Sequence, residues 1–132
     1  MKVDTHHAIS ERLCGRVIEI EVDRSLVELE LLDEMKADST GLVHGGFVFG
    51  AADYAAMLAV NDPNVVLGSA EVRFLRPSRV GERLSFEARV ENGAGKKRQV
   101  AVVARNGEGA EVFSGHFACF VLGRHVLDSG GP

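Results

Sequence analysis

The chain has no tryptophan and only one tyrosine in 132 residues, and its formal net charge at pH 7 is −4. Nucleic-acid-binding domains ordinarily combine an excess of basic charge with aromatic side chains on which bases stack. We therefore expect no nucleic-acid partner. Basic residues do gather locally, at Arg73, Arg76, Arg79 and Arg83 and again at Lys96–Arg98, where a small polyanionic ligand can find cationic contacts.

Cysteines and long apolar runs are also scarce. Cys14 and Cys119 are too far apart in sequence to form a CxxC motif, which argues against a metal knuckle and a redox pair of that type. The longest apolar stretch, Phe47 to Val60, is interrupted by Asp53 and is shorter than the ~20 residues that a membrane-spanning helix needs. No secretory signal or lipidation motif is apparent. We expect a cytoplasmic protein with two reduced, buried thiols and no membrane partner.

Hydrophobic residues make up 45% of the chain and charged residues 26%, as is usual for a globular protein with a packed core. The length fits one domain over residues 1–132, in which we expect 1–14 to form an N-terminal segment and 123–132 a flexible tail. Helical spacing of apolar residues after Asp4, taken as the N-cap, predicts a short helix over 4–13 that packs on one edge of the fold.

Alternating apolar and polar residues dominate the rest of the chain. Two such stretches flank "DRS" and predict a β-hairpin with one face in water. The residues predicted to face inward are Ile18, Ile20, Val22, Val27, Leu29 and Leu31. Four more strands are predicted in "VVLGSAEVRFLR", "ERLSFEARV", "RQVAVVAR" and "AEVFSGHFACFVL", the last two joined by the turn sequence "NGEG".

Between the hairpin and these strands, the sequence predicts a helix from about Gly46 to Val60, ended by Pro63. Asp53 is its only charged side chain, so the helix has no polar stripe to face water. A sheet covers one side of such a helix, and we expect a second copy of the chain to cover most of the remainder. The pattern therefore predicts a homodimer.

The combination resembles the hotdog-fold family. The resemblance is carried by His44-Gly45-Gly46, by the Ala-rich helix whose acid follows nine residues after the His, and by "AEVRFLRPSRVGERLSFEARV", and it covers about residues 15–122. It implies an α+β fold in which an antiparallel sheet wraps one central helix and two subunits join their sheets into one. These features are similar to acyl-CoA thioesterases of the phenylacetate-degradation type, which implies hydrolysis of an acyl-CoA by a homodimer or a dimer of dimers (homotetramer).

A second resemblance points to a different class of protein. "SAEVRFLRPSRVGERLSFEARV" and "EVFSGHF" are also similar to the effector domain of bacterial fatty-acid-synthesis repressors, which binds malonyl-CoA and does no chemistry. In that family the helix acid is typically Asn and the first residue of the His-Gly-Gly site is typically Arg. Here those positions hold Asp53 and His44. The alternative function is therefore a non-catalytic acyl-CoA-binding or sensing protein.

Thioester hydrolysis needs a group that polarises the carbonyl and a nucleophile or a base that activates water. Amide groups at a helix start are unpaired and carry partial positive charge, and the resemblance assigns the oxyanion contact to Gly45. Asp53 is the candidate nucleophile or general base. Because Gly46 and Asp53 are ~10 Å apart along a helix axis, they cannot act on one carbonyl within one chain. The resemblance implies that the acid and the glycine amide of each site come from opposite subunits.

The remaining site residues are less specific. His44 either contacts the thioester or fixes the turn through hydrogen bonds, and Asp53 has an alternative role as a buried structural acid. Many relatives have Ser or Thr one turn after the acid, where this chain has Met57. The expected substrate-binding residues are Gly46, Thr40, Tyr54, Met57, Ser69, Arg73 and Arg76. We expect no metal, because no group of His, Asp or Glu has ligand spacing, and no cofactor beyond the coenzyme A of the substrate.

Overall fold

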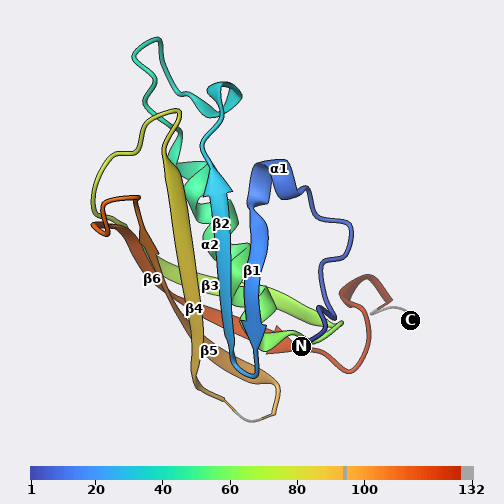
Figure 1. Ribbon diagram of the computed structural model, residues 1–132. Helices are drawn as coiled ribbons and strands as arrows, with labels where there is room; N and C mark the ends of the chain where they lie inside the picture. The colour runs from blue at the N-terminus through green and yellow to red at the C-terminus, as the bar shows by residue number, and fades with distance from the viewer. Residues whose placement is uncertain (94, 129–132) are drawn as a thin grey trace.

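The computed structural model describes residues 1–93 and 95–128, and it contains one antiparallel sheet curved around one long helix (Figure 1). This confirms the α+β hotdog architecture, and the central helix begins one residue earlier than predicted. In chain order the elements are α1 (Glu11–Cys14), β1 (Arg16–Glu21), β2 (Arg24–Glu30), η1 (Asp33–Met35), α2 (Gly45–Val60), β3 (Val65–Phe74), β4 (Arg83–Asn92), β5 (Lys97–Arg105), β6 (Glu111–Val121) and η2 (Val126–Asp128).

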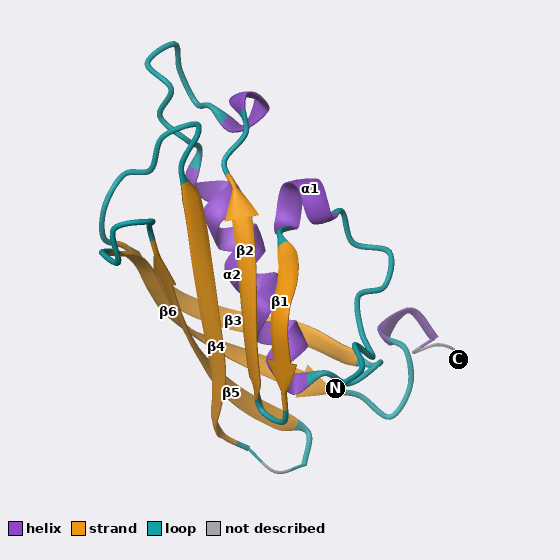
Figure 2. Cartoon of the chain, in the orientation of Figure 1, coloured by secondary structure: helices purple, strands orange, loops and turns teal. Residues whose placement is uncertain are grey.

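The six strands lie in the order β1-β2-β4-β5-β6-β3, with every neighbouring pair antiparallel. All four strands predicted after the helix are present. The turn between β5 and β6 is the predicted one, in which the Asn106 side-chain oxygen accepts hydrogen bonds from the amides of Glu108 and Ala110, each at 3.0 Å. Figure 2 shows the strands wrapping the helix, with β1 and β3 at the two edges of the sheet.

The predicted facing of the first strand is wrong. The register of β1 against β2 shifts between Val17 and Glu19, so two successive residues, Ile18 and Glu19, both face outward. Val17 and Ile20 pack against the core, whereas Ile18 and Val22 are exposed. The second strand of the hairpin agrees with its prediction, because Val27, Leu29 and Leu31 are all buried.

The N-terminal helix is much shorter than predicted. Only the single turn α1 forms, and its N-cap is Ser10, whose hydroxyl oxygen accepts a hydrogen bond from the Leu13 amide at 3.4 Å. Asp4 instead donates its amide to the side-chain oxygen of Asn61 at 2.7 Å, far along the chain. The positive φ of His6, 53°, is incompatible with a continuous helix through residues 4–13.

The N-terminal segment lies along α2 and does not cover a sheet edge. Thr5 is 3% exposed, and the ring centroids of His6 and Tyr54 are 6.2 Å apart. Val3, Ile9 and Leu13 also pack against the core. The N-terminal segment therefore covers part of the helix surface that we predicted a second copy of the chain would cover.

Small side chains let α2 lie close to the inner face of the sheet. Its buried residues are Val48, Ala51, Ala52, Tyr54, Ala55, Ala56, Met57, Leu58 and Ala59. The Ser25 hydroxyl of β2 donates to the Ala55 carbonyl at 2.6 Å, a contact that a larger neighbouring side chain would obstruct. The sheet contributes three fully buried aromatic side chains to the core, Phe86 from β4 and Phe113 and Phe117 from β6.

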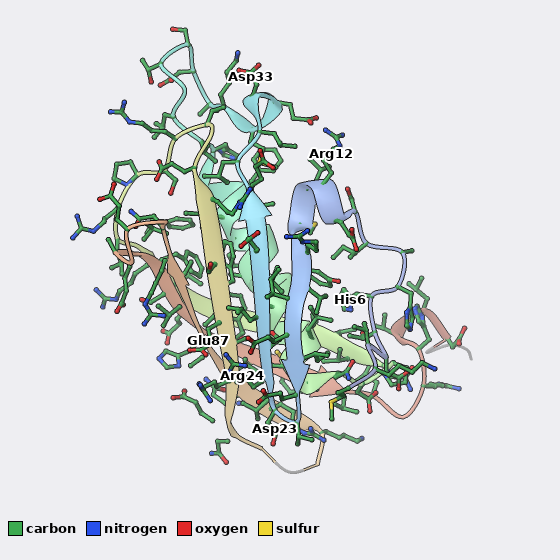
Figure 3. The ribbon with its side chains drawn as sticks, viewed as in Figure 1. His6, Arg12, Asp23, Arg24, Asp33 and Glu87 are labelled. Carbon is green, nitrogen blue, oxygen red and sulfur yellow. The ribbon has the colours of Figure 1, made fainter. Side chains whose placement is uncertain are left out.

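The outer face of the sheet carries an ion-pair cluster around Arg24, near Glu87 in Figure 3. The Arg24 guanidinium donates to Glu19 at 2.7 Å and to Glu87 at 2.8 Å, which joins β1, β2 and β4. Hydrogen bonds to these two carboxylates raise the pKa of Arg24 above its usual range, and Arg24 lowers the pKa of Glu87. The cluster contributes to the cohesion of the sheet on the face away from α2.

The C-terminal region is described up to residue 128. The short helix η2 occupies part of the stretch predicted to be a flexible tail, and residues 129–132 of that prediction lie outside the described residues. Within the described ranges, no helix is long and apolar enough to cross a membrane.

Candidate active site

The start of α2 is held by two neighbouring loops. The Val43 amide donates to the Ser78 carbonyl and the His44 amide to the Met35 carbonyl, each at 2.9 Å. His44 is the N-cap residue, but its side chain makes no capping hydrogen bond. A helix leaves its first amide groups without intrahelical acceptors, so the Gly45 amide is available to a ligand oxygen. The local structure thus agrees with the oxyanion contact predicted for Gly45.

His44 lies beside this helix start. A Cβ built on Gly46 would come within 3.1 Å of the His44 Nε2 atom, so the imidazole covers the place where a side chain at position 46 would stand. The ring also makes an edge contact with Phe47, with centroids 6.2 Å apart and an interplanar angle of 82°. His44 is exposed, so the ring is accessible to a ligand at the helix start.

One face of α2 remains open. Gly46 and Gly50 share this face with Asp53, because residues four and seven positions apart return to nearly the same side of a helix. A Cβ at Gly50 would meet no atom within 4 Å, so space exists beside the helix there. Met57 is the next residue along this face, but it is only 1% exposed, so the open part of the face ends before it. The open face therefore extends from the helix start to Asp53.

Asp53 is an isolated, half-buried acid. Its Oδ1 atom is buried and has no hydrogen-bond partner among the described residues. Loss of water around the carboxyl group raises its pKa to about 6. The Asp53 charge in turn helps burial to raise the pKa of Cys14, and that of Cys119 to about 12, so both thiols are held in the protonated form. Cys119 is buried as predicted, while Cys14 is only half-buried.

Such an acid should destabilise the folded protein at neutral pH. The Asp53 pKa is about 6 in the folded chain, whereas its ordinary value is 3.8, so between these pH values the folded state binds a proton that the unfolded state has lost. The stabilising effect of that proton is complete below pH 3.8 and is lost as pH rises to about 6. We therefore compare the free energy of unfolding of Asp53→Asn with that of wild type. The difference, Asp53→Asn minus wild type, should be roughly 2 kcal/mol larger at pH 7 than at pH 4. Urea unfolding of both proteins at several pH values measures this difference, and a pH-independent difference would contradict it.

Gly45 and Asp53 do not meet within the chain. Eight residues of helix separate them by about 12 Å along the axis, which is too far for both to contact one thioester carbonyl. Gly45 instead lines a cavity of about 310 Å³ at the end of the sheet, which Asp53 does not line. The two groups thus do not form one site within the chain.

The other predicted binding residues are dispersed. Thr40 is exposed on the loop that extends beyond the sheet, and its hydroxyl donates to Asp38 at 2.6 Å. Tyr54 is buried against the N-terminal segment, and Met57 belongs to the core. The structure does not bring these three side chains together, and their roles stay predictions.

The two arginines predicted to bind substrate lie in different places, one on strand β3 and one in the loop after it. Arg73 and Ser69 pair with Ser114 and Ala118 of β6 on the outer face, away from α2. Arg76 follows β3 and lines the same cavity as Gly45. Of the two arginines proposed to bind substrate, Arg76 is therefore the one near the helix start.

Two apolar residues beside Gly45 were not among the predicted site residues. The alternation in "VVLGSAEVRFLR" predicts that Phe74 faces inward with Ala70 and Val72, yet Phe74 is 56% exposed because it ends its strand, and Leu75 is 46% exposed. The sequence "FL" before "RP" does indicate an exposed apolar residue here. Two adjacent large apolar residues of a strand point to opposite faces, so they cannot both face the core. Within the described residues, no group of three or more His, Cys, Asp or Glu is arranged to hold a metal ion.

Comparison with known proteins places the chain in a family. The thioesterase superfamily profile matches residues 40–113, more than half of the chain. A methylthioribose-1-phosphate isomerase of Aquifex aeolicus is 48% identical over 117 residues, which are 89% of this chain and 25% of that protein. The transcription factor FapR of Bacillus cytotoxicus is 29% identical over 83% of this chain and 57% of its own length. The chain thus spans only about a quarter to just over half of these two relatives.

Solved structures show the same fold. An uncharacterized protein of Pyrococcus horikoshii has 52% identity and a TM-score of 0.95, and the match covers 97% of this chain and 98% of that one. At 22% identity, the PaaI protein of the Escherichia coli phenylacetic acid degradation operon has a TM-score of 0.79 over 86% of this chain and 83% of its own. A Streptococcus mutans protein bound to acetyl CoA, also 22% identical, has a TM-score of 0.80 over 91% and 98%. The chain belongs to the thioesterase superfamily and has its hotdog fold.

Proposed function

We propose that the protein is an acyl-CoA thioesterase that hydrolyses a thioester to a free acid and coenzyme A. The observation that carries this proposal is the buried Asp53 carboxylate, whose Oδ1 has no partner within the described chain and which lies on an open helix face. An unpaired buried carboxylate destabilises a fold, so its presence in a thioesterase-superfamily chain favours a chemical role over a structural one.

The proposed active site is shared by two copies of the chain. Asp53 of one subunit and the Gly45 amide of its partner act on one carbonyl, because the two groups of a single chain are too far apart. The edge strand β3 supports dimerisation: it pairs with β6 on one side only, so its other side has backbone groups available to a second copy. A dimer of dimers and a cytoplasmic location stay predictions.

The proposed chemistry follows from these two groups. The Asp53 carboxylate either attacks the thioester carbon or removes a proton from a water that attacks it. The carbonyl oxygen becomes negative and is stabilised by the Gly45 amide at the positive end of the helix dipole. The carbon–sulfur bond then breaks, and the sulfur of coenzyme A leaves with a proton that originates from water. In the direct-attack route, a second step hydrolyses the Asp53 acyl anhydride.

Support for coenzyme A as the carrier comes from the fold and from charge. The Streptococcus mutans protein with the same fold binds acetyl CoA. In this chain, Arg76 lies at the cavity next to Gly45 and is suited to contact a phosphate of the carrier. The assignment is tested by incubating the purified protein with a panel of acyl-CoA thioesters and following release of free coenzyme A thiol. Absence of turnover with every thioester would refute the proposed activity.

A second candidate is an acyl-CoA-binding protein without catalysis. The 29% identity to the FapR transcription factor favours it, as does the buried Met57 at the position where many thioesterase relatives have a Ser or Thr hydroxyl. This alternative predicts saturable binding in calorimetry, with the acyl-CoA recovered intact. Hydrolysis of the bound thioester by wild type would exclude it.

The pKa of Asp53 fixes the expected pH dependence of the proposed reaction. Either route needs the carboxylate form, and burial raises the Asp53 pKa to about 6. We expect kcat/KM to be constant above pH 7 and to fall about tenfold per pH unit well below pH 6. Initial rates with one acyl-CoA over pH 4.5–8 test this, with thioester stability measured in blanks without enzyme. A profile that is flat through pH 6 would contradict this expected pH dependence.

A further inference from the structure

Two exposed apolar side chains flank the cavity at the start of α2. Phe74 is 56% exposed and Leu75 is 46% exposed, and both line the cavity of about 310 Å³ together with Val43, Val48 and Val112. Large apolar side chains exposed side by side are uncommon outside binding surfaces. The cavity is therefore apolar on most of its walls.

Phe74 lies directly against the proposed carbonyl-binding residue. A Cβ built on Gly45 would come within 3.1 Å of the Phe74 ring, so the absence of a side chain at position 45 leaves room for this aromatic ring. The ring is fixed from behind by the buried Phe113, with centroids 5.3 Å apart and planes at 74°. An edge contact of this kind stabilises one orientation of an aromatic pair. Phe74 thus forms a defined wall next to the Gly45 amide.

The backbone that carries this wall is also fixed. The amides of Leu75 and Arg76 both donate to the Val112 carbonyl, at 2.9 and 3.3 Å. The first residues after β3 are therefore held against the start of β6, and the apolar side chain of Leu75 projects beside the cavity while Arg76 supplies its cation. A small-molecule site typically combines such apolar walls with a few placed polar groups.

We propose that this cavity holds the acyl group of the substrate, that the acyl group is an apolar chain, and that Phe74 limits its length. The inference rests on the proposed function for the identity of the ligand, and it follows from the juxtaposition of the Gly45 amide with an apolar wall. A carbonyl oxygen bound at Gly45 places the adjoining carbon chain beside Phe74. An apolar chain gains from contact with the Val43, Val48 and Leu75 walls.

The test compares chain-length preference in three variants. Phe74→Ala enlarges the cavity, Phe74→Trp reduces it, and Phe120→Ala is a matched control because Phe120 lies on the outer face of the sheet, packed over Gly68. We expect the ratio of kcat/KM for decanoyl-CoA to that for butyryl-CoA to rise about tenfold or more in Phe74→Ala and to fall in Phe74→Trp. Phe120→Ala should keep the wild-type ratio.

Binding separates this inference from the proposed function. Dissociation constants for the same acyl-CoA series are measured by calorimetry in the Asp53→Asn background, where they do not depend on turnover. If wild type hydrolyses nothing but Phe74 variants still reorder the affinities, the proposed activity fails and the acyl site stands. An unchanged order in both Phe74→Ala and Phe74→Trp overturns the acyl site. A change of oligomeric mass in light scattering without reordering also overturns it, because Phe74 would then belong to a subunit contact.

Discussion

Asp53→Asn is expected to lower kcat/KM for the best acyl-CoA substrate about 10³-fold while leaving the protein folded. Asn has nearly the same shape as Asp but neither attacks a thioester nor accepts a proton from water. The carboxyl group is isolated, since its Oδ1 has no partner among the described residues, so the substitution breaks no hydrogen bond that holds the helix. Steady-state assays of thiol release measure the loss directly.

Asp23→Asn is the matched control for this experiment. Asp23 is exposed in the turn between β1 and β2 and has a φ of 61°, a conformation that Asn adopts readily. The control should retain wild-type kcat/KM. If Asp53→Asn also retains it, Asp53 has no catalytic role, and the sensor alternative becomes the better account of the fold.

The second large effect is expected from the Gly45 amide. Gly45→Pro removes the N–H group, whereas Gly45→Ala keeps it and adds a comparable Cβ. Proline is well tolerated as the first residue of a helix, and the preceding His44 has φ −66° and ψ 128°, which suits a residue before proline. We expect kcat/KM of Gly45→Pro to be about 10²–10³-fold below that of Gly45→Ala, because one oxyanion donor is lost.

The comparison with alanine is essential. Both substitutions bring a Cβ to within 3.1 Å of the Phe74 ring, so both require the ring to shift, and only the N–H group distinguishes them. Equal activity of the two variants would remove the Gly45 amide from the mechanism. A loss shared by both would assign the effect to crowding against Phe74.

The same two variants test whether the site is shared between subunits. If Asp53 and Gly45 of one site come from different chains, a mixed dimer of Asp53→Asn and Gly45→Pro subunits has one intact site and one doubly damaged site. Random exchange of equal amounts then restores about a quarter of wild-type activity from two inactive parents. A mixture that stays inactive after verified subunit exchange would place both groups of each site in one chain.

The fold was predictable because its periodicities are strong. Alternation gave the strands from β2 onward, and the single acid in an apolar helix located α2. The first strand is present and Ile20 faces inward as predicted, but the inward facing of Ile18 and Val22 was wrong. A β-bulge at Ile18 shifts the alternation by one residue, and the apolar–acidic alternation "IEIEV" has no mark of where such a shift occurs. The N-terminal helix was wrong because its residues bond to Asn61, a contact across 57 positions that local spacing does not reveal.

The site was predictable only where a short motif carried it. The positions of Gly45 and Asp53 on α2 follow from helix geometry, and the structure has them where the sequence expected. Arg73 and Ser69 were expected near the substrate, yet the pairing of β3 with β6 places them on the outer sheet face. Phe74 was missed because alternation assigned it to the core, and the end of a strand is where alternation ceases to determine burial.

Asn61 makes the first residues of the chain depend on the last turn of the helix. Its side chain bonds to the backbone of Lys2 and Asp4, and its own left-handed conformation, with φ 54° and ψ 49°, ends α2. The N-terminal segment can therefore dock only after the helix has formed, which makes it a late event in folding. Because few backbone hydrogen bonds hold this segment, its amides should exchange with solvent by local opening, at lower free energy than those of the sheet. Such an opening would uncover Tyr54 while the rest of the fold remained closed.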